Sequence, residues 1–90
     1  MKFEFDKQKN TINKSKHGID FIEAQALWED PYSFEIPSTH SEGEERYLAL
    51  GRIQSKHFTA IFTYREDKVR IISVRRSREK EVKLYESIRA

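Results

Sequence analysis

The chain has 90 residues, of which 37% are hydrophobic and 12% aromatic, and this length predicts one domain over residues 1–90 with a modest core. It has no cysteine, which excludes a disulfide framework and a thiolate zinc site, and its three histidines offer little to a metal. We therefore expect no metal and no other cofactor. The N-terminus is charged and no apolar run reaches about 18 residues, so we expect neither a signal peptide nor a membrane span, and a cytoplasmic protein.

The formal net charge of +2 conceals a division of charge along the chain. Residues 1–45 hold five lysines, no arginine and ten acidic residues, which gives −5. Residues 46–90 hold 12 Lys plus Arg against five acidic residues, which gives +7, and all eight arginines lie there. Because a guanidinium is a planar, permanently charged fork that matches pairs of phosphate oxygens, this bias indicates a phosphate-bearing partner. The alternative is a solvated basic face with no specific partner.

The N-terminal segment predicts a strand followed by a helix. Residues 2–5 alternate between charged and aromatic side chains, as a strand does. Asp6 can cap a helix over residues 7–16, which His17 and Gly18 would end.

A second, strongly apolar helix is predicted next. Asp20 followed three residues later by Glu23 resembles a capping box, and residues 30–31 (Asp-Pro) end the apolar pattern. A short strand over residues 32–36 and an exposed loop over residues 37–43 follow.

The second half predicts a meander of three antiparallel strands joined by tight turns, over residues 45–53, 56–65 and 68–75. A last helix starts at Ser77 or Arg78 and carries a partly apolar stripe. The coarse prediction is an α+β domain with an antiparallel sheet (meander), two N-terminal helices and one C-terminal helix.

The last strand runs into a cluster of arginines. Alternation places one set of side chains on one face and a second set on the other: Ile71, Ser73 and Arg75 against Arg70, Ile72, Val74 and Arg76. At this strand end, a sheet edge and a helix N-terminus can jointly face a phosphate. We expect Arg75 to be the main phosphate clamp with Arg76 behind it; the alternative is a salt bridge to Glu79 or Glu81.

Four motifs occur in a characteristic order: FEFD, KHGI with Phe21 behind it, GEERYLALG, and RIISVRRS with Glu81 and Tyr85 behind it. Together they resemble the BrnT-type toxins of bacterial type II toxin–antitoxin systems over nearly the whole chain. The resemblance implies a compact RelE-like ribonuclease that cleaves RNA and arrests growth. It also implies a BrnA-like antitoxin whose ribbon-helix-helix part binds the operator DNA. Ser77 departs from the alanine that relatives often carry, which leaves the arginines unaffected.

Metal-free RNA cleavage requires a base for the ribose 2′-OH, cations around the phosphorane and an acid for the 5′ oxygen. The chain shows no histidine pair for this purpose, so Arg, Lys, Glu and Tyr are the available groups. Lys16 and His17 can simply offset the negative end of the first helix. The matching KHGI motif implies instead that Lys16 contacts phosphate or carries a proton, with His17 as its support or as a second carrier.

Glu45 and Arg46 are adjacent on a predicted strand and point to opposite faces, so only one can face the site. We choose Arg46, with Glu45 as a weaker candidate base, because an unpaired glutamate beside phosphate is unfavourable unless it is catalytic.

Further candidate RNA contacts are Arg52, Arg70 and Tyr64. Arg70 flanks a hairpin, where exposed cations also protect sheet edges. Tyr64 and Tyr85 can stack on a base or donate a proton, and the alternative is a buried tyrosine with a satisfied hydroxyl.

Two other functions use the same arginines. One is a noncatalytic nucleic-acid-binding domain, and the other is an interaction domain that meets an acidic protein. In the toxin hypothesis, an acidic or apolar antitoxin segment covers the arginine cluster, and operator DNA is contacted only through the antitoxin.

Overall fold

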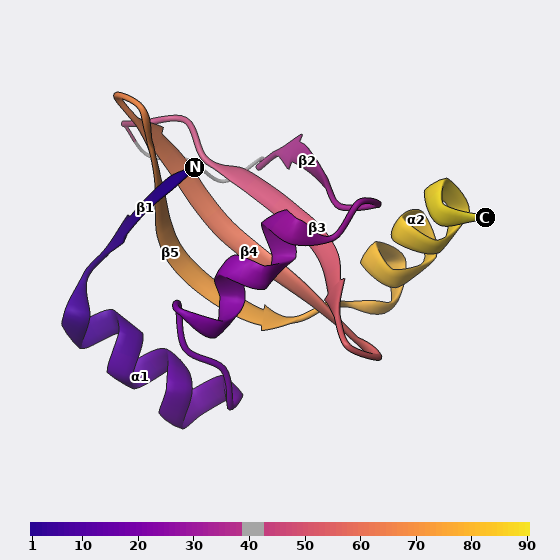
Figure 1. The fold of residues 1–90 in the computed structure, drawn as a ribbon, viewed down its shortest axis with the longest axis horizontal. Coiled ribbons are helices and arrows are strands. Elements are labelled where there is room, and N and C mark those ends of the chain that lie inside the picture. Colours follow the sequence, from indigo (N-terminus) through magenta and orange to yellow (C-terminus); the bar gives the residue numbers. More distant parts are fainter. Residues whose placement is uncertain (39–42) are drawn as a thin grey trace.

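The computed structural model describes residues 1–38 and 43–90; the part of the predicted loop at residues 39–42, which includes His40, lies outside the described residues. The fold is a mixed α+β domain with five strands, two α-helices and one 3₁₀ helix (Figure 1). In chain order the elements are β1 (Lys2–Phe5), α1 (Lys7–His17), η1 (Glu23–Glu29, the 3₁₀ helix), β2 (Phe34–Pro37), β3 (Tyr47–Ile53), β4 (Lys56–Arg65), β5 (Lys68–Arg76) and α2 (Glu79–Arg89).

The strands form one sheet in the order β1-β5-β4-β3-β2. The predicted meander is confirmed, because β3, β4 and β5 pair antiparallel in sequence order and β2 joins β3 antiparallel. The prediction of an antiparallel sheet is wrong at one edge, where β1 pairs parallel to β5. Parallel neighbours need a long crossover, and α1, η1 and three strands lie between β1 and β5 in the chain.

The first helix begins and ends as predicted. The Asp6 side chain accepts a hydrogen bond from the main-chain N–H of Lys9 at 3.0 Å. Gly18 ends the helix in the left-handed conformation, with φ of 74°, and its N–H bonds to the carbonyl of Lys14.

A buried asparagine attaches α1 to the sheet. The Asn13 side chain donates to the Val74 carbonyl at 2.9 Å and accepts from the Val74 N–H at 3.0 Å. Its amide also donates to the carbonyl of Ile19 at 2.8 Å. Because the β1 pairing ends opposite Ile71, this side chain replaces a strand partner for the last part of β5.

The prediction of two N-terminal α-helices is wrong, since the second helical segment is the 3₁₀ helix η1. Its predicted capping box is present: the Glu23 N–H bonds to Asp20 at 2.7 Å, and the Asp20 N–H bonds to Glu23 at 2.9 Å. Phe21, Ala24 and Leu27 are all fully buried and are spaced three residues apart. With three residues per turn, a 3₁₀ helix puts such a set on one face, whereas an α-helix would spread it.

The predicted alternation along β5 is also corrected. Ser73 lies opposite Ile61, but the next register pair joins Ile71 to Phe62, so Ile72 is an extra, unpaired residue in a β-bulge. Ile71 and Val74 therefore both reach the core, although strict alternation had separated them. The bulge also places Arg70 on the same face as Ser73 and Arg75. Arg76 remains on the opposite face from Arg75, as predicted.

The sheet has two different faces. The η1 face packs against η1 and α1 and holds the main core, whose strand residues are Ala49, Phe58, Ala60, Phe62, Val69, Ile71 and Val74. The α2 face carries Leu48, Leu50, Thr59, Ile61, Thr63, Ser73 and Arg75. In Figure 1, η1 crosses the sheet, whereas α2 lies at one end of it beyond β3. Since α2 covers only part of its face, Leu48 and Ile61 stay half-buried beside it.

Candidate functional site on the α2 face

The uncovered part of the α2 face forms a pocket of about 490 Å³. Its charged lining consists of Arg46, Arg75, Arg78 and Glu81, which we call the arginine pocket. Leu48 and Ile61 form its apolar floor, and Ile36, Pro37 and Ser38 line its remaining side.

Three separate elements bring the arginines together. Arg46 immediately precedes β3, and the Thr63 hydroxyl of β4 donates to the neighbouring Glu45 carbonyl at 2.6 Å, which holds this backbone beside the sheet. Arg75 lies near the end of β5, opposite Thr59 in the register. Arg78 is the N-cap residue of α2, two residues after β5 ends.

Arg75 and Glu81 form a bidentate ion pair, with Nη1–Oε1 and Nη2–Oε2 distances of 2.7 and 2.9 Å. Their side chains are 19% and 14% exposed, so the pair is shielded but reachable from the pocket. Burial raises the pKa of Glu81, but hydrogen bonds from Arg75, the Arg78 N–H and Thr59 outweigh burial and lower it to about 2. Glu81 is therefore ionised at neutral pH. The Glu81 carboxylate in turn raises the pKa of Arg75.

Within the described residues, the guanidinium groups of Arg46 and Arg78 form no ion pair with a carboxylate. The Nε atom of Arg46 is buried and makes no hydrogen bond there. The described lining of the arginine pocket thus carries three guanidinium groups and one carboxylate. Such an excess of permanent cations in a partly dehydrated pocket binds anionic oxygen groups, and a planar guanidinium suits phosphate.

Glu45, Lys16 and His17 do not line this pocket. The exposed Glu45 accepts a hydrogen bond from the Tyr47 hydroxyl at 2.8 Å and lines an adjoining cavity that Arg46 also lines. Lys16 and His17, at the end of α1, line a cavity of about 160 Å³ with Ser73. Ser73 lies opposite Ile61 in the register, so this second cavity lies across β5 from the arginine pocket.

Three other predicted residues have partners away from the arginine pocket. The guanidinium of Arg76 lies over the Phe58 ring, 5.6 Å from its centroid, on the η1 face. Arg70 pairs with Glu4 at 2.7 Å on the β1 side of the sheet. The Tyr64 hydroxyl donates to Glu35, and burial together with this carboxylate raises the pKa of Tyr64 to about 12.

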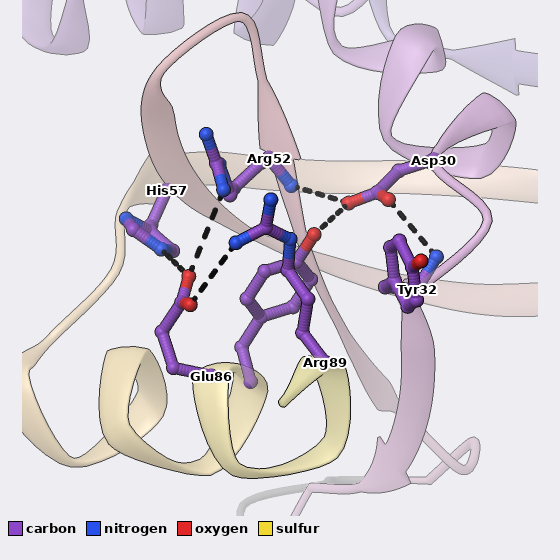
Figure 2. A network of polar contacts seen from close by, with 7 residues as sticks. Asp30, Tyr32, Arg52, His57, Glu86 and Arg89 are labelled. Atoms are coloured by element: carbon purple, nitrogen blue, oxygen red, sulfur yellow. Dashed lines mark hydrogen bonds and ion pairs between the residues drawn. The ribbon is translucent and has the colours of Figure 1, made fainter.

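Tyr85 and Arg52 belong to a polar network at the other end of α2, which Figure 2 shows from close by. Tyr85 is 2% exposed and its hydroxyl donates to Asp30 Oδ2 at 2.6 Å, which matches the alternative of a buried tyrosine with a satisfied hydroxyl. Burial and the Asp30 carboxylate raise its pKa to about 12. The Arg52 main-chain N–H donates to the same oxygen at 2.8 Å.

The second carboxylate of this network is Glu86 of α2. Its oxygens lie 2.7 Å from His57 Nε2, 3.3 Å from Arg89 Nη1 and 3.9 Å from Arg52 Nη1 (Figure 2). The network therefore attaches the C-terminal half of α2 to β3, β4 and the end of η1, and leaves the arginine pocket beside the first turn of the helix.

Arg78 and Glu81 were not among the predicted site residues. Arg78 was predicted only as a possible helix start, whereas Glu81 belonged to the motifs that carry the family resemblance and was the ion-pair partner of Arg75 in the alternative interpretation. Their three-residue spacing at the start of a helix is that of a capping box, which was the available signal.

Among the described residues, no group of three or more His, Cys, Asp or Glu side chains is arranged to hold a metal ion. In the same part of the chain, no helix has the length and apolar character needed to cross a membrane.

These features define a small α+β domain with a cationic pocket on one sheet face. The family model described as "Ribonuclease toxin, BrnT, of type II toxin-antitoxin system" matches residues 5–81. The chain therefore belongs to the BrnT family of ribonuclease toxins, and the match includes every residue that lines the arginine pocket. A comparison with curated protein sequences found no significant match.

Proposed function

We propose that this chain is an endoribonuclease toxin of RelE-like type that acts in the bacterial cytoplasm and cleaves RNA in the arginine pocket without a metal ion. The observation that carries the proposal is the convergence of Arg46, Arg75 and Arg78 around one carboxylate. These three permanently charged guanidinium groups can stabilise the negative charge of the transition state, a role that a metal ion has in other phosphodiester-cleaving enzymes.

In this reaction the ribose 2′ oxygen attacks the adjacent phosphorus, so that an O2′–P bond forms and the P–O5′ bond breaks. The products are a 2′,3′-cyclic phosphate and a free 5′-hydroxyl. One proton leaves the 2′-OH and another is delivered to the 5′ oxygen. Arg75 clamps the scissile phosphate, and Arg46 and Arg78 neutralise the charge that develops on the phosphorane.

The proton transfers are assigned to groups outside the lining of the pocket. Glu45 is the candidate base because it lies beside Arg46 and is exposed. Lys16 and His17 are candidate proton carriers or contacts to a flanking phosphate, across β5. Glu81 is a poor base, because its pKa of about 2 lies far below the operating pH.

The test is cleavage of single-stranded RNA by the purified chain in the presence of EDTA. Arg75→Ala should lower kcat/KM by about 10²–10³-fold, the usual loss when a charge-stabilising donor is removed. Arg65→Ala is the matched control, since Arg65 is half-exposed and its one ion pair among the described residues is with Glu44, at 3.6 Å. Thermal unfolding of both variants checks that the fold persists.

Two results would overturn the assignment. RNA that is bound with a steep salt dependence but stays intact would indicate the noncatalytic nucleic-acid-binding alternative. No RNA binding even at low salt would indicate an interaction domain for an acidic protein. Cleavage that occurs without EDTA but is lost in its presence would overturn only the claim that the reaction needs no metal ion.

The same pocket is the proposed docking surface for a BrnA-like ribbon-helix-helix antitoxin. In this proposal only the antitoxin contacts the operator DNA. An acidic or apolar segment of the antitoxin would compete with phosphate for Arg75. Arg75→Glu should then weaken both RNA cleavage and antitoxin binding. Undiminished antitoxin binding by this variant would place the antitoxin on another surface.

A further inference from the structure

Glu81 receives four hydrogen bonds from three elements of the fold. Both outer nitrogens of Arg75, near the end of β5, donate to it at 2.7 and 2.9 Å. The hydroxyl of Thr59 in β4 donates to Oε1 at 2.9 Å, and the main-chain N–H of Arg78 donates to the same oxygen at 2.8 Å. The carboxylate is therefore fixed in place, and it fixes the plane of the Arg75 guanidinium.

The same carboxylate closes the first turn of α2. Its bond from the Arg78 N–H is one half of the α2 capping box. The Ser77 and Thr59 hydroxyls lie 2.8 Å apart and join the preceding turn to the sheet. The orientation of Arg75 is thus coupled to the folded start of α2.

We propose that Glu81 is a positioning residue for RNA cleavage: it holds Arg75 as a pre-oriented fork in the arginine pocket. This inference rests on the proposed ribonuclease function. An arginine side chain has several rotatable bonds, and ordering it during the reaction costs conformational entropy. The ion pair orders the side chain already in the folded state. Nη1 of Arg75 also donates to the Arg76 carbonyl at 3.3 Å, so the N–H groups that remain for a phosphate are those on Nε and Nη2.

A simpler role for Glu81 makes the opposite prediction. If this carboxylate only neutralises Arg75, its removal leaves a more positive pocket that attracts RNA more strongly and cleaves it at least as fast. If Glu81 positions Arg75, its removal lowers kcat even though RNA binding is unchanged or tighter. The separation of kcat from KM therefore distinguishes positioning from neutralisation.

The experiment is steady-state cleavage of a single-stranded RNA oligonucleotide by the wild-type chain, Glu81→Gln and Glu79→Gln. Glu79→Gln removes the same charge from the same turn of α2, but the Glu79 side chain is 84% exposed and, within the part of the chain that the structure describes, pairs with Lys83 alone, at 3.2 Å. We expect Glu81→Gln to lower kcat by about 10–100-fold, the range for a misplaced catalytic group, with KM unchanged or lower. Glu79→Gln should behave as the wild type.

Thr59→Val provides a second variant in case Glu81→Gln does not fold. It removes the hydrogen bonds of the Thr59 hydroxyl to Glu81 and to Ser77 but keeps the charge and the shape, so it should lower kcat in the same direction by a smaller factor. A Glu81→Gln enzyme that cleaves as fast as the wild type, or that loses only substrate affinity, would overturn the positioning role alone. Absence of cleavage by the wild-type chain would overturn the proposed function and this inference with it.

Discussion

Asp30 is predicted to be the largest single polar contributor to the stability of the α2 attachment. Asp30 Oδ2 accepts hydrogen bonds from the buried Tyr85 hydroxyl at 2.6 Å and from the Arg52 main-chain N–H at 2.8 Å (Figure 2). Burial raises the pKa of Asp30, but these bonds and one from the Tyr32 N–H outweigh burial and lower it. The charged carboxylate is therefore the form that the fold stabilises.

Asp30→Ala leaves two shielded donors without an acceptor, on Tyr85 and Arg52, while the exposed Tyr32 N–H turns to water. An unsatisfied buried donor costs about 1–3 kcal/mol, so for two donors we expect the free energy of unfolding to fall by about 2–6 kcal/mol. For a domain of this size, even a loss of about 2 kcal/mol corresponds to a fall in Tm of roughly 8–16 °C.

The assay is urea unfolding followed by circular dichroism, combined with a double-mutant cycle between Asp30→Ala and Tyr85→Phe. We expect the double variant to lose less stability than the sum of the losses of the two single variants, because each single change removes the same hydrogen bond. Asp67→Ala is the control, since the Asp67 side chain is 68% exposed and its single ion pair over residues 1–38 and 43–90 is with Lys2, at 3.6 Å. A loss below about 1 kcal/mol for Asp30→Ala, or no coupling to Tyr85, would refute the assignment of buried donors to this carboxylate.

Three further predictions concern the sheet and the site. Gly51→Ala should lower the free energy of unfolding, measured in urea, by about 1–3 kcal/mol, because the new Cβ would lie 3.0 Å from Leu27 Cδ2. Wild-type stability of this variant would show that η1 shifts to accommodate the methyl group. Asn13→Ala should cost about 1–3 kcal/mol and speed hydrogen exchange at the Val74 amide, which loses its acceptor; unchanged exchange would contradict this. The folded-state pKa of Glu81, about 2, lies below its ordinary value of 4.5, so the contribution of its ionised carboxylate to the free energy of unfolding is complete above pH 4.5 and is lost as the pH falls toward 2. The Glu81→Gln variant should therefore lose less stability than the wild type between pH 4.5 and 2. Equal losses would contradict the assignment.

The local sequence determined most of the elements, because caps and turns act over a few residues. Asp6 and Gly18 bound α1 as predicted. The tight turns after β3 and β4 contain Gln54 and Glu66 with φ of 59° and 57°, and both lie where the breaks between strands were predicted. The meander follows from these turns, since short connections make neighbouring strands antiparallel.

The tertiary structure decided the features that depend on packing. Phe21 just before η1 and Ala24 and Leu27 within it are all fully buried, and their three-residue spacing fits the three residues per turn of a 3₁₀ helix. The bulge at Ile72 has no signal in the alternation of β5, because it depends on the pairing with β4. The parallel position of β1 likewise depends on a partner that lies far along the chain.

For the candidate site, composition alone revealed the excess of arginine in residues 46–90, since a charge count needs no structure. Which arginines share a pocket was decided by the fold, because Arg46, Arg75 and Arg78 come from the start of β3, the end of β5 and the cap of α2. The same tertiary contacts placed Glu81 against Arg75 and took Tyr85 into the core. A side chain's partners are set by elements distant in sequence, and for this reason the sequence by itself indicated the phosphate chemistry but not the full set of residues around it.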